Sequence, residues 1–115
     1  MLNEQDFFDV LSDDIRRRIL ALLLGQGELC VCEIQVALDM AQHKISRHLA
    51  VMREAELLSM QREGTWVYYR VHPQLPLWTF RIMENFAQGV AHSRAYQADK
   101  RRLESMSNRP AHCVT

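Results

Sequence analysis

Two cysteines separated by one residue, Cys30 and Cys32, are the side chains in this sequence best suited to bind a soft metal or metalloid. A third thiol, Cys113, lies near the C-terminus. An odd number of cysteines without an export signal argues against a disulfide framework, so we expect reduced thiols that are available as soft ligands. The alternative is that one thiol of the pair packs as a small apolar residue while the other has no role.

The spacing of this thiol pair connects a bound ion to the backbone that carries it. In a regular helix of about 3.6 residues per turn, side chains at positions i and i+2 point about 200° apart. On an undisturbed helix, Cys30 and Cys32 could therefore not hold one ion. We expect binding to both thiols to bend or unwind the first helical turn.

Two amphipathic helices are predicted from the thiol pair onward. Their apolar residues recur at helical spacing; these are Ile34, Ala37 and Leu38 in the first helix and Ile45, Leu49 and Met52 in the second. The helices meet near residues 39–42, which predicts a helix-turn-helix. Ligand binding at the thiols would then change the orientation of a DNA-reading unit.

The polar face of the second helix carries amide, hydroxyl and cationic side chains. Such groups can bond base edges in the major groove or phosphates. The candidates for DNA contact are Gln42, His43, Lys44, Ser46, Arg47 and His48. A polar helix face is more often plain solvated surface, and it is the neighbouring thiol pair that favours DNA here.

A β-hairpin is predicted after the second helix. Residues 57–62 and 66–71 are rich in aromatic and β-branched side chains and are joined by a turn at residues 63–65. A hairpin that follows a helix-turn-helix is the wing of a winged-helix domain, and its tip commonly lies along the DNA backbone or in a minor groove. The tip residues are Arg62, Gly64 and Thr65. The alternative is an ordinary hairpin without a ligand.

Helices are predicted at both ends of the chain. A short one covers residues 6–11, and a second runs from a cap at Ser12 or Asp13 to about Leu24, where the glycines that follow end it. Residues 77–106 are helical again. The apolar surface of the terminal helices exceeds what a small domain buries, which predicts a two-fold dimer. Its two reading helices would lie about 34–36 Å apart and match an inverted repeat.

The length of 115 residues fits one domain, for which we expect a mainly α fold with a β-hairpin wing (α+β). The expected parts are a winged helix-turn-helix domain with dimerising terminal helices at residues 1–106 and a flexible tail at residues 107–115. No apolar run approaches the roughly 18–20 residues that cross a bilayer, and the N-terminus lacks the basic start of a signal peptide. We expect no membrane association and a cytoplasmic location.

The formal net charge is zero, but the charges are segregated. Acidic residues crowd the first fourteen positions, whereas basic residues fall in the reading segments and the C-terminal stretch. Phosphate attraction depends on this distribution more than on the total. The arginine triplet at residues 16–18 is predicted to lie on a solvated face or to pair with aspartates rather than to touch phosphate.

The order of these pieces resembles the small winged-helix metalloregulators of the ArsR type, and most closely their arsenic-responsive repressors. The resemblance covers most of residues 7–72, and its most specific part is the E-L-C-V-C box at residues 28–32 before a reading helix. It implies a homodimeric repressor rather than an enzyme. Such a repressor binds operator DNA and dissociates when trivalent arsenic or antimony binds the thiolates, and no organic cofactor is implied.

Two positions depart from this pattern. Several arsenic repressors have a third cysteine one turn beyond the C-x-C, where this chain has Gln35. Cys113 of either subunit is therefore a candidate third ligand for trivalent arsenic, which holds up to three thiolates. Otherwise a small thiol completes the shell or two sulfurs suffice, which would also suit monosubstituted organoarsenicals. The second departure is Glu56, where relatives usually have a glycine that ends the reading helix in left-handed geometry.

Four alternative functions compete with this one. A pure protein-interaction module would show no salt-dependent DNA binding. A zinc or cadmium sensor of this fold would use Asp and His side chains at the dimer interface, but His92 has no acidic partner at a suitable spacing. A thiol redox switch would oxidise Cys30 and Cys32. An enzyme would need an orienting Asp or Asn and a loop that stabilises an oxyanion, and neither accompanies the thiols.

Overall fold

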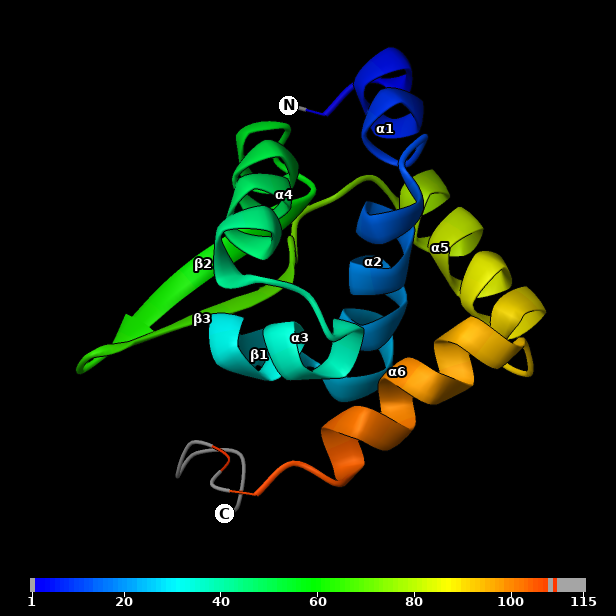
Figure 1. The fold of residues 1–115 in the computed structure, drawn as a ribbon. Coiled ribbons are helices and arrows are strands. Elements are labelled where there is room, and N and C mark those ends of the chain that lie inside the picture. The colour runs from blue at the N-terminus through cyan, green and yellow to red at the C-terminus, as the bar shows by residue number, and fades with distance from the viewer. Residues whose placement is uncertain (1, 108, 110–115) are drawn as a thin grey trace.

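The computed structural model describes residues 2–107 and residue 109. Along the described chain the elements are α1 (Glu4–Val10), α2 (Asp14–Gln26), β1 (Glu28–Cys30), α3 (Val31–Leu38), α4 (Gln42–Glu54), β2 (Leu58–Glu63), β3 (Trp66–Val71), α5 (Leu77–Val90) and α6 (Arg94–Glu104). The β2–β3 hairpin projects from one side of the helices. Helix α5 lies on the other side of α2, and α6 runs below α2 and α3 (Figure 1). This is the mainly α fold with a hairpin wing that the sequence predicts.

The helix-turn-helix is formed by α3 and α4, as predicted. Asp39 has a left-handed backbone, with φ of 53°, and its N–H and that of Met40 donate to carbonyls of the last turn of α3. This geometry ends α3 sharply. The six apolar residues predicted to face inward are all buried: Ile34, Ala37, Leu38, Ile45, Leu49 and Met52.

The sheet has three strands in the order β1-β3-β2, and both pairings are antiparallel. Strand β1 was not predicted; it pairs Cys30 with Tyr68 and so joins the thiol segment to the wing. Glu63 pairs with Trp66, so the connecting loop is Gly64-Thr65, one residue shorter than predicted. Gly64 has φ of 60°, a conformation that residues with a Cβ adopt at a cost.

Helix α2 begins where expected and ends later. The Asp13 side chain accepts a hydrogen bond from the Arg16 N–H at 3.1 Å, which confirms the N-cap. The helix continues through Gly25 to Gln26, because a glycine weakens a helix without ending it. It ends at Gly27, whose φ is 90°.

The three arginines at residues 16–18 are only partly exposed, and their side chains bind other parts of the chain. The guanidinium of Arg18 pairs with Asp99 of α6 at 2.6 Å, and that of Arg17 lies 3.9 Å from the carboxylate of Asp14. The predicted pairing with aspartates is confirmed, in one case with a partner far along the chain. Arg16 and Arg17 donate to the carbonyls of Val10 and Leu11 at the end of α1. The triplet therefore holds α1 and α6 onto α2.

The C-terminal helical region is two helices, because the chain turns at residues 91–93. Helix α6 packs against α2 and α3. Arg102 donates to Asp99 and to the carbonyl of Ala37 near the end of α3, both at 2.8 Å. Among the described residues, no helix has the length and apolar character that a bilayer crossing requires.

Candidate functional site

Cys30 and Cys32 lie side by side at the start of α3, with their Sγ atoms 2.8 Å apart. Cys30 is the N-cap and has extended backbone angles, φ −86° and ψ 168°, because it ends strand β1. The argument that the two side chains point apart on one regular helix therefore does not apply, since only Cys32 lies in the helix. The bend at the cap turns both thiols to the same side, so they can approach one ion without unwinding of α3.

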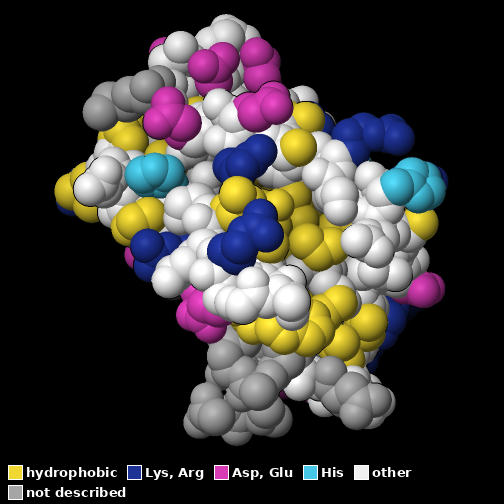
Figure 2. Space-filling view, turned by 90° about the vertical axis from the view of Figure 1, so that its left-hand side faces the viewer, with side chains coloured by type: hydrophobic (Ala, Val, Ile, Leu, Met, Phe, Trp, Pro, Cys, Tyr) yellow, Lys and Arg dark blue, Asp and Glu magenta, His cyan; other side chains and the backbone are white. Residues whose placement is uncertain are grey.

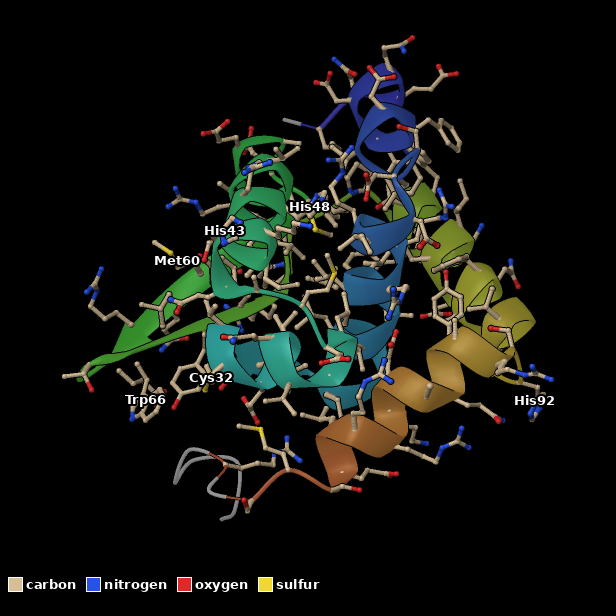
Figure 3. All side chains as sticks on the ribbon, in the orientation of Figure 1. Cys32, His43, His48, Met60, Trp66 and His92 are labelled. Atoms are coloured by element: carbon tan, nitrogen blue, oxygen red, sulfur yellow. The ribbon has the colours of Figure 1, made fainter. Side chains whose placement is uncertain are left out.

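The two thiols differ in their surroundings. Cys30 is 1% exposed, whereas Cys32 is partly exposed near the wing (Figure 3). Burial raises the pKa of the Cys30 thiol well above its usual range, and the hydrogen bond with Cys32 raises it further. Cys30 is therefore protonated at neutral pH. A ligand must approach from the side of Cys32 and must accept the proton of Cys30.

A buried carboxylate, Glu33, lies directly beside the thiol pair. Glu33 is fully buried, and one of its oxygens accepts the Cys30 N–H at 2.9 Å. The other oxygen accepts the Nε–H of Arg109 at 2.8 Å, so the carboxylate bridges the N-cap of α3 and the C-terminal segment. A buried carboxylate requires such partners, because an unpaired buried charge is strongly unfavourable.

The polar face of α4 is largely solvent-exposed. Five of the six predicted side chains are exposed: Gln42, His43, Lys44, Ser46 and Arg47. Figure 2 views the side of the molecule that carries α4 and the wing, and it shows Lys and Arg side chains in the middle and acidic side chains along the top. The segregation of charge predicted from the sequence is thus present on this surface.

His48 differs from the other five side chains. Its side chain is only 19% exposed, and its Nδ1 lies 3.4 Å from Nη1 of Arg16 and 3.9 Å from a carboxylate oxygen of Asp13. The structure therefore places His48 between α4 and the start of α2, rather than on the exposed face. Its contacts orient α4 against the core.

The predicted wing tip is exposed throughout. Arg62, Gly64 and Thr65 lie at the end of the hairpin, away from the core. Trp66 begins β3 and is 44% exposed. Because Cys30 pairs with Tyr68 in the adjacent strand, the wing and the thiol pair belong to one sheet.

A divalent metal site is not supported by the described residues. Among them, no group of three or more His, Cys, Asp or Glu side chains is arranged to hold an ion. Asp99, a buried acidic residue of α6, is engaged by Arg18 and Arg102. Cys113 lies outside the described residues.

Comparisons with known proteins identify the family. The model of the bacterial regulatory protein, arsR family, matches residues 13–59, which include α2, α3 and α4. The chain is 45% identical to the arsenic resistance transcriptional regulator ArsR1 of Pseudomonas putida over 103 residues, which are 90% of this chain and 79% of that protein. The chain belongs to the ArsR family. Its members are regulatory proteins, which confirms the expectation of a regulator rather than an enzyme.

Three further proteins that are similar to this chain are transcriptional repressors or share its fold. The arsenical resistance operon repressor of Escherichia coli is 48% identical over 77 residues, 67% of this chain and 66% of that protein. The antimony-specific transcriptional repressor AntR has a solved structure with a TM-score of 0.62 and 27% identity, and the match covers 74% of each chain. The solved structure of HlyU from Vibrio cholerae has a TM-score of 0.67 and 24% identity to this chain. The match covers 75% of this chain and 89% of the HlyU chain, and it supports the fold alone.

Glu56 adopts the backbone expected of a glycine in an ArsR-family chain. Its φ is 66°, and the N–H groups of Glu56 and Leu57 donate to the carbonyls of Arg53 and Met52. This is the hydrogen-bond pattern of a Schellman C-cap. The turn after α4 is therefore formed in spite of the substitution.

The Glu33–Arg109 bridge was missed by the sequence reasoning. A glutamate three residues after a helix N-cap is the spacing of a capping box, and this signal could have identified Glu33. No comparable signal identifies Arg109, which is 76 positions away. The site of this ArsR-family protein therefore includes one contact that only the fold reveals.

Proposed function

We propose that this ArsR-family protein is a metalloid-responsive transcriptional repressor. In this proposal a homodimer binds an inverted-repeat operator in the cytoplasm and dissociates when trivalent arsenic or antimony binds the thiolates of Cys30 and Cys32. Arsenic-resistance genes are then derepressed. The observation that carries the proposal is the convergence of both thiols, 2.8 Å apart, at the N-cap of the first helix of the helix-turn-helix.

The chemistry of the pair suits a trivalent hydroxide. Arsenite is As(OH)3 at neutral pH, and each As–S bond replaces one As–O bond while the thiol proton and the hydroxide leave as water. Arsenic stays trivalent, and no base is needed to deprotonate the buried Cys30. We propose Cys113 as the third ligand. Without it, arsenite bound by two thiols keeps one hydroxide, and a monosubstituted organoarsenical bound by two thiols keeps its organic group.

The coupling to DNA runs through the backbone of Cys30. This residue ends β1, pairs with Tyr68 of the wing strand and caps α3. Bonds from both sulfurs to one arsenic atom fix the two side chains relative to each other, so Cys30 must adjust to the new geometry. We propose that this shift moves α3 and the wing together, in place of the helix unwinding predicted from the sequence.

For the DNA contacts we propose the exposed face of α4 in the major groove and the wing tip on the backbone. The side chains concerned are Gln42, His43, Lys44, Ser46 and Arg47 on α4, and Arg62, Gly64 and Thr65 at the tip. His48 supports this surface from behind, through Arg16. Because the formal net charge is zero, we expect modest affinity for non-specific DNA. Operator affinity should then depend strongly on the side chains of α4 and the wing tip.

For the dimer we propose an interface formed by α1 and α5. Large apolar side chains on these helices are exposed in the single chain: Phe8, Leu77, Trp78 and Ile82. The ring of Phe7 lies 5.3 Å from that of Trp78 in an edge-on arrangement, so the two helices present one continuous surface. A contiguous apolar patch of this kind marks an interaction surface.

A gel-shift titration of the operator complex tests the proposal. Arsenite or antimonite should release the DNA from the wild-type protein, whereas zinc and cadmium at equal concentration should not. Cys30→Ser and Cys32→Ser should bind the operator normally and fail to respond to arsenite. Normal arsenite response in both variants would refute the thiol site.

A thiol redox switch is the second candidate, because two free thiols in contact could also be oxidised to a disulfide. Excess reductant distinguishes the two functions. Release of the operator by arsenite under reducing conditions requires direct binding to the thiols. Release by peroxide alone, reversed by reductant, would favour the redox switch.

A further inference from the structure

We propose that Trp66 is a specificity-determining residue of the metalloid site. Its indole packs against the organic group of a monosubstituted trivalent arsenical that is held by Cys30 and Cys32, so the site favours an aryl group over a methyl group. The inference rests on the proposed function, because it concerns the same two thiols. Two sulfurs satisfy such an arsenical, so the ligands and the indole all lie within the described residues.

The register of the sheet determines which side chains surround the thiols. Cys30 of β1 lies opposite Tyr68 of β3. Side chains that are directly opposite each other in an antiparallel pair share one face of the sheet, with Cβ atoms about 4.5–5.5 Å apart. The neighbouring pair, Leu29 and Tyr69, points to the other face, where Leu29 is fully buried and Tyr69 packs against the core. The Cys30 thiol therefore lies beside Tyr68, on the face away from that cluster.

Trp66 lies on the same face, two positions before Tyr68 in β3. It is a diagonal neighbour of Cys30, and the distance of about 7–8 Å between such positions is within reach of an aromatic side chain. Because β1 and β3 are antiparallel, the chain that continues from Cys30 to Cys32 leads toward Trp66. Figure 3 agrees, since the labelled side chains of Cys32 and Trp66 lie close to each other at this edge of the sheet.

The other aromatic and diagonal neighbours of Cys30 are less accessible to a ligand. Tyr68 is 2% exposed, so its ring is covered. Arg70, the diagonal neighbour on the far side of Tyr68, donates from Nε to the hydroxyl of Ser59 at 3.3 Å and is therefore directed toward β2. Trp66 is 44% exposed and presents an accessible indole.

The burial of the thiols fixes the direction of the third substituent on arsenic. Trivalent arsenic is pyramidal, so a substituent other than the two sulfurs points away from both of them. Cys30 is 1% exposed and Cys32 is partly exposed, so the arsenic atom must sit on the side of Cys32. Its third substituent then points outward, to the surface on which Trp66 lies.

The reaction needs no additional reactant. Two thiols and R–As(OH)2 give R–As(SR)2 and two molecules of water, so two As–S bonds replace two As–O bonds. Each thiol proton leaves with a hydroxide, the As–C bond stays intact, and arsenic remains trivalent. When R is phenyl, it offers more apolar area than methyl and a ring that can pair with the indole.

The ratio of two binding constants tests the role of Trp66. Phenylarsonous acid and methylarsonous acid are titrated against the wild-type and Trp66→Ala proteins. Trp66→Ala should lower the preference for the phenyl compound by about three- to tenfold, the range expected of one aromatic pair, and should change methylarsonous acid binding by less than about twofold. An unchanged ratio, or an equal loss for both compounds, would overturn the inference.

Three further variants separate ring contact from a structural defect. Trp66→Phe keeps an aromatic ring and should keep most of the preference. Gln61→Ala removes an exposed side chain from the same face, opposite Tyr68 on β2, and should leave the ratio unchanged. If Trp66→Ala does not fold, as judged by thermal unfolding, Trp66→Leu takes its place, because leucine fills the position without a ring.

The emission of Trp66 gives an independent readout. In a Trp78→Phe background Trp66 is the single tryptophan of the chain. Phenylarsonous acid should change its emission and saturate at one equivalent per protomer, and the change should be absent when Cys30 is replaced by serine. Constant emission at saturating phenylarsonous acid would contradict contact with the indole.

These outcomes are distinct from failure of the proposed function. If the arsenicals still release the operator from Cys30→Ser and Cys32→Ser proteins, the thiol site itself is wrong. If those variants are unresponsive but Trp66→Ala keeps the wild-type ratio, only the role of Trp66 is wrong.

Discussion

The two helices of the helix-turn-helix are held in different ways. Helix α3 is fixed by charged contacts at both ends, from Arg109 to Glu33 at its start and from Arg102 to the carbonyl of Ala37 near its end. Helix α4 is fixed through its apolar face and through the part-buried His48. Helix α3, which begins at the thiol pair, is thus connected to the C-terminal part of the chain, whereas the polar face of α4 is exposed.

This difference predicts separable defects. Changes around α3 should alter stability or the response to metalloid, and changes on the exposed face of α4 should alter DNA affinity alone. Two of the three test variants below address that separation, and the third tests the turn that ends α4. Each is paired with a control, and they are ordered from the largest expected effect to the smallest.

Asp99→Asn should destabilise the fold without impairing DNA reading. The carboxylate is 1% exposed and receives Arg18 and Arg102 at 2.6 and 2.8 Å. Removing its charge leaves Arg18 partly buried without its counter-ion, whereas Arg102 is about two-fifths exposed and contributes less. We expect a loss of about 2–3 kcal/mol in the free energy of unfolding, measured by urea denaturation.

Asp14→Asn is the matched control, because Asp14 is an exposed aspartate whose ion pair with Arg17 is long at 3.9 Å. Its stability should match that of the wild type. Equal stability of Asp99→Asn and wild type would show that α6 is not held by this cluster.

Arg47→Ala should weaken operator binding while arsenite affinity is unchanged. The side chain is exposed on α4 and is of the kind that forms bidentate contacts with guanine or binds phosphate. We expect a loss of about 1–2 kcal/mol in binding free energy, which is about five- to thirtyfold in affinity, measured by fluorescence anisotropy at fixed salt.

Arg101→Ala, on α6, removes an exposed arginine from a part of the surface outside both the DNA-contact face and the proposed dimer interface. It should leave operator affinity at the wild-type level. A loss of arsenite affinity in Arg47→Ala would contradict the separation of the two helices.

Glu56→Gly should stabilise the protein slightly. Glu56 has φ of 66°, where a residue with a Cβ is strained by about 1 kcal/mol, and glycine removes that strain at some cost in chain entropy. We expect a net gain of about 0.5 kcal/mol in the free energy of unfolding, measured by urea or thermal denaturation.

Ala55→Gly is the comparison for Glu56→Gly. Ala55 has φ of −77°, so glycine there adds flexibility without relieving strain and should destabilise. Destabilisation by both variants would mean that the contacts of Glu56 outweigh its backbone strain.

Much of the fold followed from local pattern. Helical periodicity identified α3 and α4 by their buried residues Ile34, Ile45 and Leu49, and the aromatic and β-branched content of residues 66–71 identified the wing strand. These signals are strong because each depends only on residues that are close together in the sequence. The same reasoning placed the thiol pair beside the reading unit.

The parts that escaped prediction depend on distant partners. Strand β1 has three residues and exists only because β3 pairs with it. Without β1, Cys30 was assigned to a helix, and the geometry of the thiol pair was predicted wrongly. Likewise, nothing near Arg18 in the sequence indicates Asp99, and nothing near Glu33 indicates Arg109.

The two tryptophans of the chain lie on the two surfaces proposed to contact DNA and the partner subunit, Trp66 on the wing and Trp78 on α5. Each is about two-fifths exposed, so the emission of each indole will respond to whatever covers it. Replacing one at a time with phenylalanine would give two optical probes in an otherwise unlabelled protein. One would follow promoter occupancy and the other subunit association, in real time during a single metalloid titration.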